Sequence, residues 1–395
     1  MPNEPAPRPM ARDPRAWALI LAATLTILSN ATISPALPGL EASFADHPDA
    51  ARLVRLLVTA PALAVALIAP FAGIITDRFS RRRLLLGGIA LYAVAGTVAA
   101  FIPTLEGMLV SRVVLGISVA AIMVAQTALI GDYFEGAARG RFIGWQMAAT
   151  NFGGFVFILA AGWLAAISPR WPFALYAVGF AYLPFIAAVL RERPVAPTGE
   201  PAPRPAAEPA APGWAGRVAV LASMAGMTFV MFYIVPVHLP FYLASLGLSD
   251  PALTAQVMAA TTVAGGLTAL AFGRVRARLG GRVTPALGYL IVAAGFAAMA
   301  AAGGVAGLIA ANAVLGIGLG LVMPNFMTAA LNVAPAHRRG AASGAMTTAI
   351  FTGQFLSPLL TGPLFDVLGY PGGLRVAALV AVGFAGLAAL VLADR

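Results

Sequence analysis

The chain contains no cysteine and no lysine, and only 10% of its 395 residues are charged. The absence of cysteine excludes disulfides, thiolate metal sites and cysteine nucleophiles. The absence of lysine excludes a Walker A phosphate loop, and with it the motor subunit of an ATP-driven pump, as well as Schiff-base chemistry. Since a soluble domain carries about a quarter of its residues as charges, we expect lipid rather than water to solvate this chain.

Hydrophobic residues make up 60% of the sequence, and the mean hydropathy is +0.88. Stretches long enough to cross a bilayer, which takes about 20 apolar residues, recur along the chain. The run that begins near Ala16 is too long for a signal peptide and has no clear cleavage site, so we expect it to be retained. We predict an all-α membrane protein with twelve transmembrane helices near residues 16–38, 53–75, 84–102, 107–131, 142–166, 172–190, 214–244, 252–273, 283–302, 304–331, 341–364 and 373–393.

The arginines are distributed unequally between the loops on the two sides of the predicted membrane. Twenty of the 25 lie in segments on the side of the N-terminus, four lie in loops on the other side, and Arg112 lies within a span. Positive residues mark the cytoplasmic side, so both termini are predicted to be cytoplasmic, in a bacterial inner membrane. The net charge of +10 is explained in this way without any nucleic-acid partner.

The two halves of the sequence repeat each other. Gly73 and Gly273 lie 200 residues apart, and the same offset relates Arg78 to Arg278 and the segments 114–117 and 314–317, which both read VLGI. Each half would hold six helices and enter from the same side, which makes the halves parallel repeats. We therefore predict a cytoplasmic tail at 1–15, a six-helix bundle at 16–190, a Pro/Ala-rich cytoplasmic linker at 191–213 and a second, pseudo-symmetric six-helix bundle at 214–395.

The loop after the second predicted helix reads GIITDRFSRRR from Gly73 to Arg83. It resembles the signature G-x-x-x-D-R-x-G-R-R, called motif A, of the major facilitator superfamily, with Ser80 in place of the later glycine. A degenerate copy begins at Gly273, where Ala277 replaces the aspartate. The resemblance covers nearly the whole chain and implies the major facilitator fold, which is built from such parallel repeats, with twelve-helix drug/proton antiporters or sugar-efflux-like members as the similar types.

The resemblance implies a gate at the cytoplasmic side. Gly73 would let helices 2 and 11 approach closely, and Asp77 would lie beside the N-terminus of helix 11, where a carboxylate is favourable. An arginine of the loop would pair with the carboxylate at the end of helix 4. The alternative is that these arginines only obey the positive-inside rule. The predicted gating residues are Gly73, Asp77, Arg78, Arg81, Arg82, Asp132 and Arg278.

Arg112 and Gly116 in helix 4 are similar to the family's motif B, R-x-x-x-G, which implies proton-coupled transport. A buried arginine is costly and marks function by default, although a long side chain can also reach the outer interface. Motif C of the antiporters is only partly present. Asn151, Gly153 and Gly154 stand where it should appear in helix 5, without its proline.

In the implied fold, helices 1, 4, 7 and 10 line a central cavity, with help from helices 2, 5, 8 and 11. No carboxylate lies deep in a predicted span, and His238 is the intramembrane group whose ordinary pKa suits proton exchange, unless it is simply bonded at the interface. An isolated amide in a helix is as often a helix–helix hydrogen bond. The residues predicted for the cavity or for coupling are Asn30, Ser34, Arg112, Gln126, Asn151, Tyr233, His238, Asn325 and Gln354.

The sequence thus predicts a monomeric secondary transporter that works by alternating access in the lipid bilayer, with protons as coupling ion and no cofactor or metal. A cationic substrate would lack a counter-charge, so the substrate is predicted to be a small neutral or anionic amphipathic compound, and the resemblance favours efflux. The alternatives are an uptake symporter or facilitator for a sugar, nucleoside or organic acid, and a transport-inactive sensor or assembly factor of the same fold. An enzyme is not expected, because no catalytic motif is found.

Overall fold

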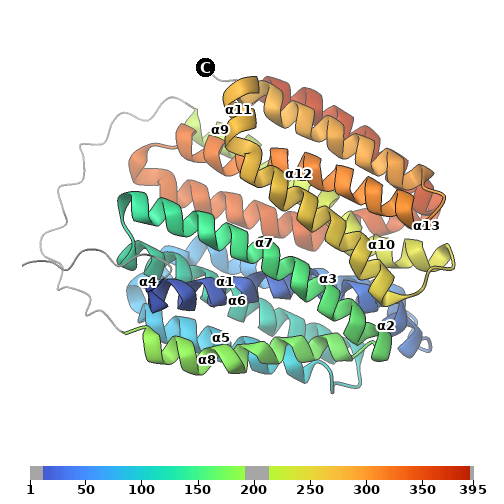
Figure 1. Ribbon diagram of the computed structural model, residues 1–395, viewed down its shortest axis with the longest axis horizontal. Helices are drawn as coiled ribbons and strands as arrows, with labels where there is room; N and C mark the ends of the chain where they lie inside the picture. Colours follow the sequence, from blue (N-terminus) through green and yellow to red (C-terminus); the bar gives the residue numbers. More distant parts are fainter. Residues whose placement is uncertain (1–11, 192–212, 392–395) are drawn as a thin grey trace, which may run out of the picture.

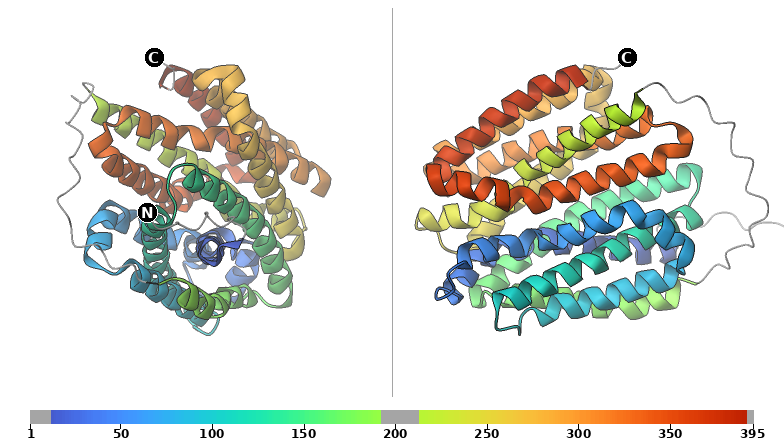
Figure 2. Two further views of the ribbon diagram at one scale, coloured as in Figure 1. Left: turned by 60° about the vertical axis from the view of Figure 1, so that its left-hand side comes forward. Right: turned by 180° about the vertical axis from the view of Figure 1, so that it is seen from behind.

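The computed structural model describes residues 12–191 and 213–391, and within them the chain is helical, with short 3₁₀ turns and no strand. Figures 1 and 2 show long helices running side by side, with the helices of the first half, blue to green, gathered on one side and those of the second half, yellow to red, on the other. Nearly all of the predicted linker lies outside the described residues.

The predicted helices of the first half correspond to the following segments, several of them interrupted by a 3₁₀ turn at a proline. They are α1 (Pro14–Ala31), η2 (Ser34–Ala36) and α2 (Leu37–Ser43), then α3 (Ala50–Ile68), η3 (Ala69–Phe71) and α4 (Ala72–Arg78), then α5 (Arg81–Val98), α6 (Leu105–Tyr133), α7 (Gly136–Ile167), η4 (Trp171–Ala177) and α8 (Val178–Val189).

The second half follows the same order with longer continuous segments. They are α9 (Trp214–Phe232), α10 (Ile234–Ser245), α11 (Pro251–Ala301), α12 (Val305–Val333), η5 (Ala336–Arg338) and α13 (Arg339–Val391). Two of these segments contain one residue with non-helical backbone: Gly280 in α11 has φ 79°, and Gly369 in α13 has φ 67°. Positive φ suits glycine because it has no Cβ, so each of these glycines marks a turn at which the chain direction changes.

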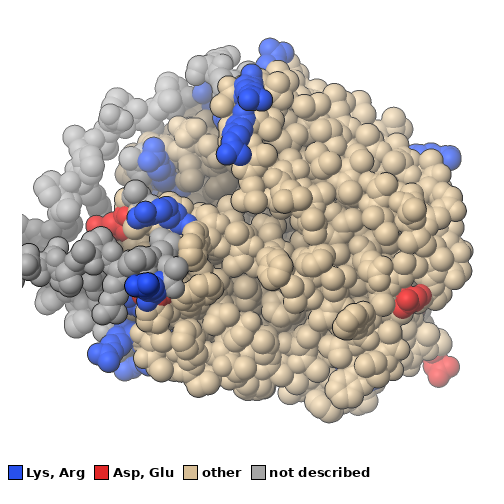
Figure 3. Space-filling view, viewed as in Figure 1, with Lys and Arg blue, Asp and Glu red and all other residues tan. Residues whose placement is uncertain are grey.

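Nine helical segments of the described residues are long and apolar enough to cross a membrane. Large apolar side chains such as Phe101, Val367 and Leu379 are more than 70% exposed, which water would not tolerate over so wide a surface. Figure 3 shows charged side chains gathered toward the two ends of the molecule, with an uncharged face between them. The chain is therefore a multi-pass membrane protein.

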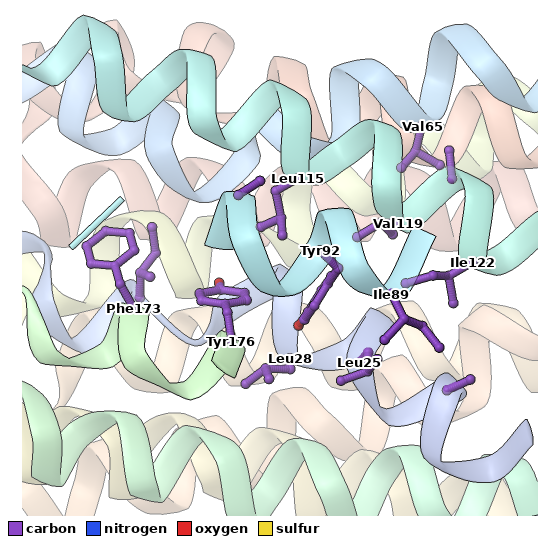
Figure 4. Packing of buried hydrophobic residues seen from close by; sticks show 14 of the residues in the cluster. Leu25, Leu28, Val65, Ile89, Tyr92, Leu115, Val119, Ile122, Phe173 and Tyr176 are labelled. Atoms are coloured by element: carbon purple, nitrogen blue, oxygen red, sulfur yellow. The ribbon is translucent and has the colours of Figure 1, made fainter. Parts of the chain in front are cut away.

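The two halves each bury their own hydrophobic cluster. One cluster consists of residues from 16–190 together with Tyr233, Val237 and Phe241, and the other consists of residues from 221–388 together with Ile158. Figure 4 shows part of the first, in which Leu25, Tyr92 and Leu115 bring three different helices together.

Helix contacts repeat at the same offset as the sequence. A Cβ added to Gly116 would stand 2.2 Å from the carbonyl oxygen of Pro61, and one added to Gly316 would stand 2.3 Å from that of Thr261. Both glycines thus allow the same close crossing, of α6 over α3 in one half and of α12 over α11 in the other, because a methyl group would not fit there.

The contact between the halves repeats as well, with the partners exchanged. Gly162 of α7 packs against Ala255 of α11, with only 2.4 Å between an added Cβ and the alanine methyl. Gly362 of α13 lies near Arg55 of α3, 3.6 Å from an added Cβ to the guanidinium. Gly362 is the counterpart of Gly162 at the 200-residue offset, and Arg55 is the counterpart of Ala255. The two contacts are therefore formed by equivalent positions with the halves exchanged, as a twofold axis between the halves requires.

Candidate functional site

A cavity of about 1190 Å³ lies between the two halves. Its walls come from the end of α3 with η3 and α4, from the second half of α6, from the second half of α9, and from the first part of α13. The lining residues include Val65, Thr76, Met123, Thr127, Met227 and Thr348.

Among the side chains that the structure describes, none that line the cavity is charged. Most lining residues are alanine, glycine, valine, leucine and methionine, and the polar ones are serines and threonines. Several of these hydroxyls already donate within the protein: Thr127 to the carbonyl oxygen of Met123 at 2.8 Å, and Thr347 to that of Ser343 at 3.0 Å. Such a surface suits a neutral, largely apolar ligand, since a buried charge would find no partner there.

The cavity reaches one end of the molecule. We call this the basic end, because the arginines at 78–83, 139–141, 274–282 and 338–339 lie in the loops and helix ends there. An added Cβ would meet nothing within 4 Å at Gly73 of α4 or at Gly340 of α13. At the opposite end, by contrast, Gly162 is packed tightly against Ala255. The halves are therefore apart at the basic end and together at the opposite, closed end.

The gate predicted at Gly73 is not engaged in this structure. Gly73 is exposed, and a Cβ added to it would meet nothing within 4 Å, so helices 2 and 11 do not approach closely there. The physical reason is the separation of the halves at the basic end. The side chain of Asp77 lies outside the described part of the structure. Arg78 and Arg278 are exposed.

Two arginines of the loop make contacts within the first half. Of the three that were considered, Arg81 forms the ion pair with Asp132 at the end of α6. Arg82 donates to the carbonyl oxygen of Ala187 at 2.8 Å and to that of Leu190. It thereby satisfies carbonyl groups at the C-terminus of α8 that have no helical partner. The loop thus ties α5 to α6 and α8.

Arg112 lies inside the first half, away from the cavity lining. Its side chain is fully buried, and its Nη1 donates to the hydroxyl of Tyr176 at 2.9 Å. The guanidinium carbon lies 4.6 Å from the ring centroid of Phe173 and 4.7 Å from that of Tyr176. Figure 4 shows both rings, with Tyr92 beside Tyr176. Aromatic faces therefore hold this cation, while its Nε and Nη2 have no hydrogen-bond partner among the described residues.

The other residues predicted for the cavity whose side chains the structure describes are not among those that line it. Three of them form hydrogen bonds within or between helices through their side-chain amides. Gln126 donates to the carbonyl oxygen of Leu19 at 2.7 Å, Asn151 donates to that of Met147 at 2.8 Å, and Asn325 accepts from Arg276 at 2.9 Å. Ser34, Tyr233 and Gln354 are buried in the helix packing. The side chain of Asn30 lies outside the described part.

His238 is buried in α10 at the closed end. Its Nε2 lies 2.8 Å from the hydroxyl of Thr361, and its ring stacks on Phe365 with 4.2 Å between centroids. Sequence reasoning missed its neighbour Arg55, which forms an ion pair with Asp366 at 3.1 Å. Arg55 lies at the start of the predicted helix 53–75 and Asp366 lies just after the predicted helix 341–364. No local pattern joins two positions that lie 311 residues apart.

The comparison with protein families finds that the model of the Major Facilitator Superfamily matches residues 19–358. Among curated proteins, the chain is 27% identical to a class C tetracycline resistance protein from Escherichia coli, over 68% of this chain and 71% of that protein. It is 31% identical to multidrug resistance protein 1 of Bacillus subtilis and to the quinolone resistance protein NorA of Staphylococcus aureus. In these two matches it spans about a third of the relative's length, 36% and 34% respectively.

Solved structures share the fold over nearly the whole chain. The inward-open xylose transporter XylE from E. coli superposes with a TM-score of 0.78 at 15% identity, covering 96% of each chain. A nucleoside transporter, NupG, superposes with a TM-score of 0.72 at 13% identity, covering 96% of this chain and 98% of that one. At these identities the likeness concerns the fold alone.

Proposed function

From the premise that this chain belongs to the Major Facilitator Superfamily, and is therefore a transporter and not an enzyme, we propose that it exports small neutral amphipathic compounds by alternating access, in exchange for protons. The observation that carries the proposal is the cavity between the halves, open at the basic end and shut at the other. Such a cavity is what a carrier of this kind presents in one of its two states.

We infer twelve crossings from the nine apolar segments. α11 and α13 have 51 and 53 residues, enough for two spans each at about 20 residues a span, and a glycine turn divides each of them. α5, with 18 residues, supplies the remaining crossing. The excess of arginine at the basic end supports the proposal that this end, with both termini, lies at the cytoplasmic face of a bacterial inner membrane. The cavity then faces the cytoplasm.

The moving parts would be the bundles 16–190 and 214–395. Each has its own buried cluster, so each can move as a body. The two contacts related by exchange, Gly162 with Ala255 and Gly362 with Arg55, would separate when the closed end opens. Arg81 and Arg82 bond within the first bundle and would travel with it.

The substrate class follows from the cavity wall. Sequence reasoning left room for an anion, with Arg112 as its counter-charge. Arg112 is enclosed by aromatic rings away from the cavity, so a neutral compound is the better match. The efflux direction and the exchange for protons are supported by the resistance proteins among the relatives and by the motif B arginine.

The test is transport by the purified protein in liposomes that contain a pH dye, under an imposed proton gradient, with a panel of neutral, anionic and cationic compounds. We expect neutral amphipathic compounds to move protons in the opposite direction. Ala345→Phe, at an exposed position of the cavity wall on α13, should block this flux. Ala294→Phe, the same change at an exposed position of α11 outside the cavity, should not.

Three outcomes would contradict the proposal. Movement of protons together with a sugar, nucleoside or organic acid would favour uptake, and failure of every compound to move or bind would favour a transport-inactive sensor. Equal loss of flux in both phenylalanine variants would mean that the cavity is not the pathway.

A further inference from the structure

An ion pair joins the two halves at the closed end. Arg55, in the second turn of α3, donates from Nη1 to Oδ1 of Asp366 in α13 at 3.1 Å. The arginine side chain is 12% exposed, whereas the aspartate is 61% exposed. The guanidinium also lies over the ring of Phe241 in α10, 5.5 Å from its centroid. Arg55 therefore reaches out of its own half into the other.

A second carboxylate lies close to the same arginine, in the first half. Glu41 of α2 interacts electrostatically with both Arg55 and Asp366. Its Oε2 is buried without a hydrogen-bond partner among the described residues, and so is Nε of Arg55. Arg55 also donates to the hydroxyl oxygen of Tyr370. The arginine thus interacts with one carboxylate of its own half and with one of the other half, while its Nε remains without a partner among the described residues.

The contact between α7 and α11, which is equivalent to the contact between α13 and α3 at the 200-residue offset, has no such charges. At the 200-residue offset, Arg55 corresponds to Ala255 and Asp366 corresponds to Ala166. There the halves close by apolar packing of Ala255 on Gly162. The halves can therefore pack together at the contact between α7 and α11 without an ion pair. The charges at the contact between α3 and α13 need an explanation other than packing.

We propose that Arg55 is the switch residue of the closed end, bonded to Asp366 while this end is shut and transferred to Glu41 when it opens. The proposal rests on the alternating access proposed above. Separation of the halves takes Asp366 away with α13, and a buried arginine without a partner would be costly. Glu41 stays in the same half as Arg55 and supplies the replacement charge. The pair thus favours the closed state, and the second carboxylate makes the open state accessible.

The chain's lack of cysteine permits a direct measurement with single reporter cysteines. Ser34→Cys is nearly isosteric, and Ser34 is fully buried in η2, which packs against α7, α10 and α11. Its hydroxyl has no hydrogen-bond partner among the described residues, so the change removes no bond. Ala341→Cys, at an exposed position of the cavity wall, reports on the basic end. A water-soluble maleimide added to the purified protein measures how open each end is.

We expect Asp366→Asn to raise the labelling rate at the Ser34→Cys reporter about fivefold, which corresponds to an ion pair at the upper end of the usual range, and to lower it at the Ala341→Cys reporter. Glu41→Gln should act in the opposite direction at both reporters. The exchanged pair, Arg55→Asp with Asp366→Arg, should return labelling toward the starting rates. Arg52→Gln, one turn earlier on α3 and exposed, is the matched control and should change neither rate.

The switch is refuted if Asp366→Asn leaves both rates unchanged, or if Glu41→Gln shifts them in the same direction as Asp366→Asn. Labelling needs no substrate, so its outcome is independent of transport. If labelling shifts as expected in a protein that transports no compound, the switch is supported and the proposed function is contradicted. Transport with unshifted labelling would do the reverse.

Discussion

Gly116 crosses Pro61 so closely that a Cβ would stand 2.2 Å from the proline's carbonyl oxygen. This crossing of α6 over α3, together with its copy at Gly316, sets how near the helices of each bundle can lie. It also leads to the first prediction, because the same substitution can be made in both halves.

Gly116→Ala and Gly316→Ala should each destabilise the protein by about 1–3 kcal/mol, the usual cost of an overpacked core. The measurement is thermal unfolding of the purified protein in detergent. Gly87→Ala in α5 is the control: a Cβ there meets nothing within 4 Å, and alanine is the better helix former. Equal stability of all three variants would contradict the close crossing.

Arg112→Gln should lower both stability and transport, because the aromatic faces of Phe173 and Tyr176 are placed to hold a cation. Tyr176→Phe should be milder, at about 1.5–3 kcal/mol for one hydrogen bond to a charged group. Melting temperature and initial flux measure the two effects. If Arg112→Lys behaved like the unmodified protein, the planar stacking of the guanidinium would not matter.

Arg81→Gln and Asp132→Asn remove the two sides of one ion pair. The pair is about one third exposed on each side, so each variant should lose only about 0.2–1 kcal/mol of stability. The double variant should lose less than the sum of the two single ones, since the shared interaction can be lost only once. Arg139→Gln, at an exposed position of α7, serves as the control. Additive losses would mean that each side chain has a separate partner.

Ser223→Asp should change which compounds are transported. Ser223 is exposed on the cavity wall in α9, and a carboxylate there would add a charge to a lining that has none among the described side chains. Neutral compounds should lose about tenfold in apparent affinity, roughly 1.4 kcal/mol, and cationic ones should gain. Competition against a labelled neutral substrate measures this. Ser223→Ala is the matched control and should preserve the preference; an unchanged preference in the aspartate variant would place the substrate elsewhere.

Much of the fold was predictable because it depends on periodic, local features. Apolar runs gave the helices, and the 200-residue offset of Gly73 and Gly273 indicated the duplication that the crossings at Gly116 and Gly316 repeat in space. The turns at Gly280 and Gly369 fall between predicted helices. These features need no knowledge of which helices meet.

The site was less predictable because a polar residue in a span carries no sign of the direction it faces. Gln126 and Asn325 bond other elements of their own half, as isolated amides often do, while the cavity is lined by small residues that have no distinctive pattern. Arg55 and Asp366 lie at the ends of distant helices, and only the packing of the halves brings them together. Gly73 could not indicate which end of the molecule stands open.

The exchange of partners between Gly162–Ala255 and Gly362–Arg55 implies an order of events in the history of the chain. A half-length ancestor that carried both contact surfaces, the one with the glycine and the one that packs on it, would have formed a homodimer through two identical contacts. A mutation to arginine at position 55 would then have appeared in both at once. Only after gene duplication and fusion could one of the two contacts acquire charges while the other kept its alanines. A symmetric homodimer could not have evolved an ion pair at only one of its two identical contacts.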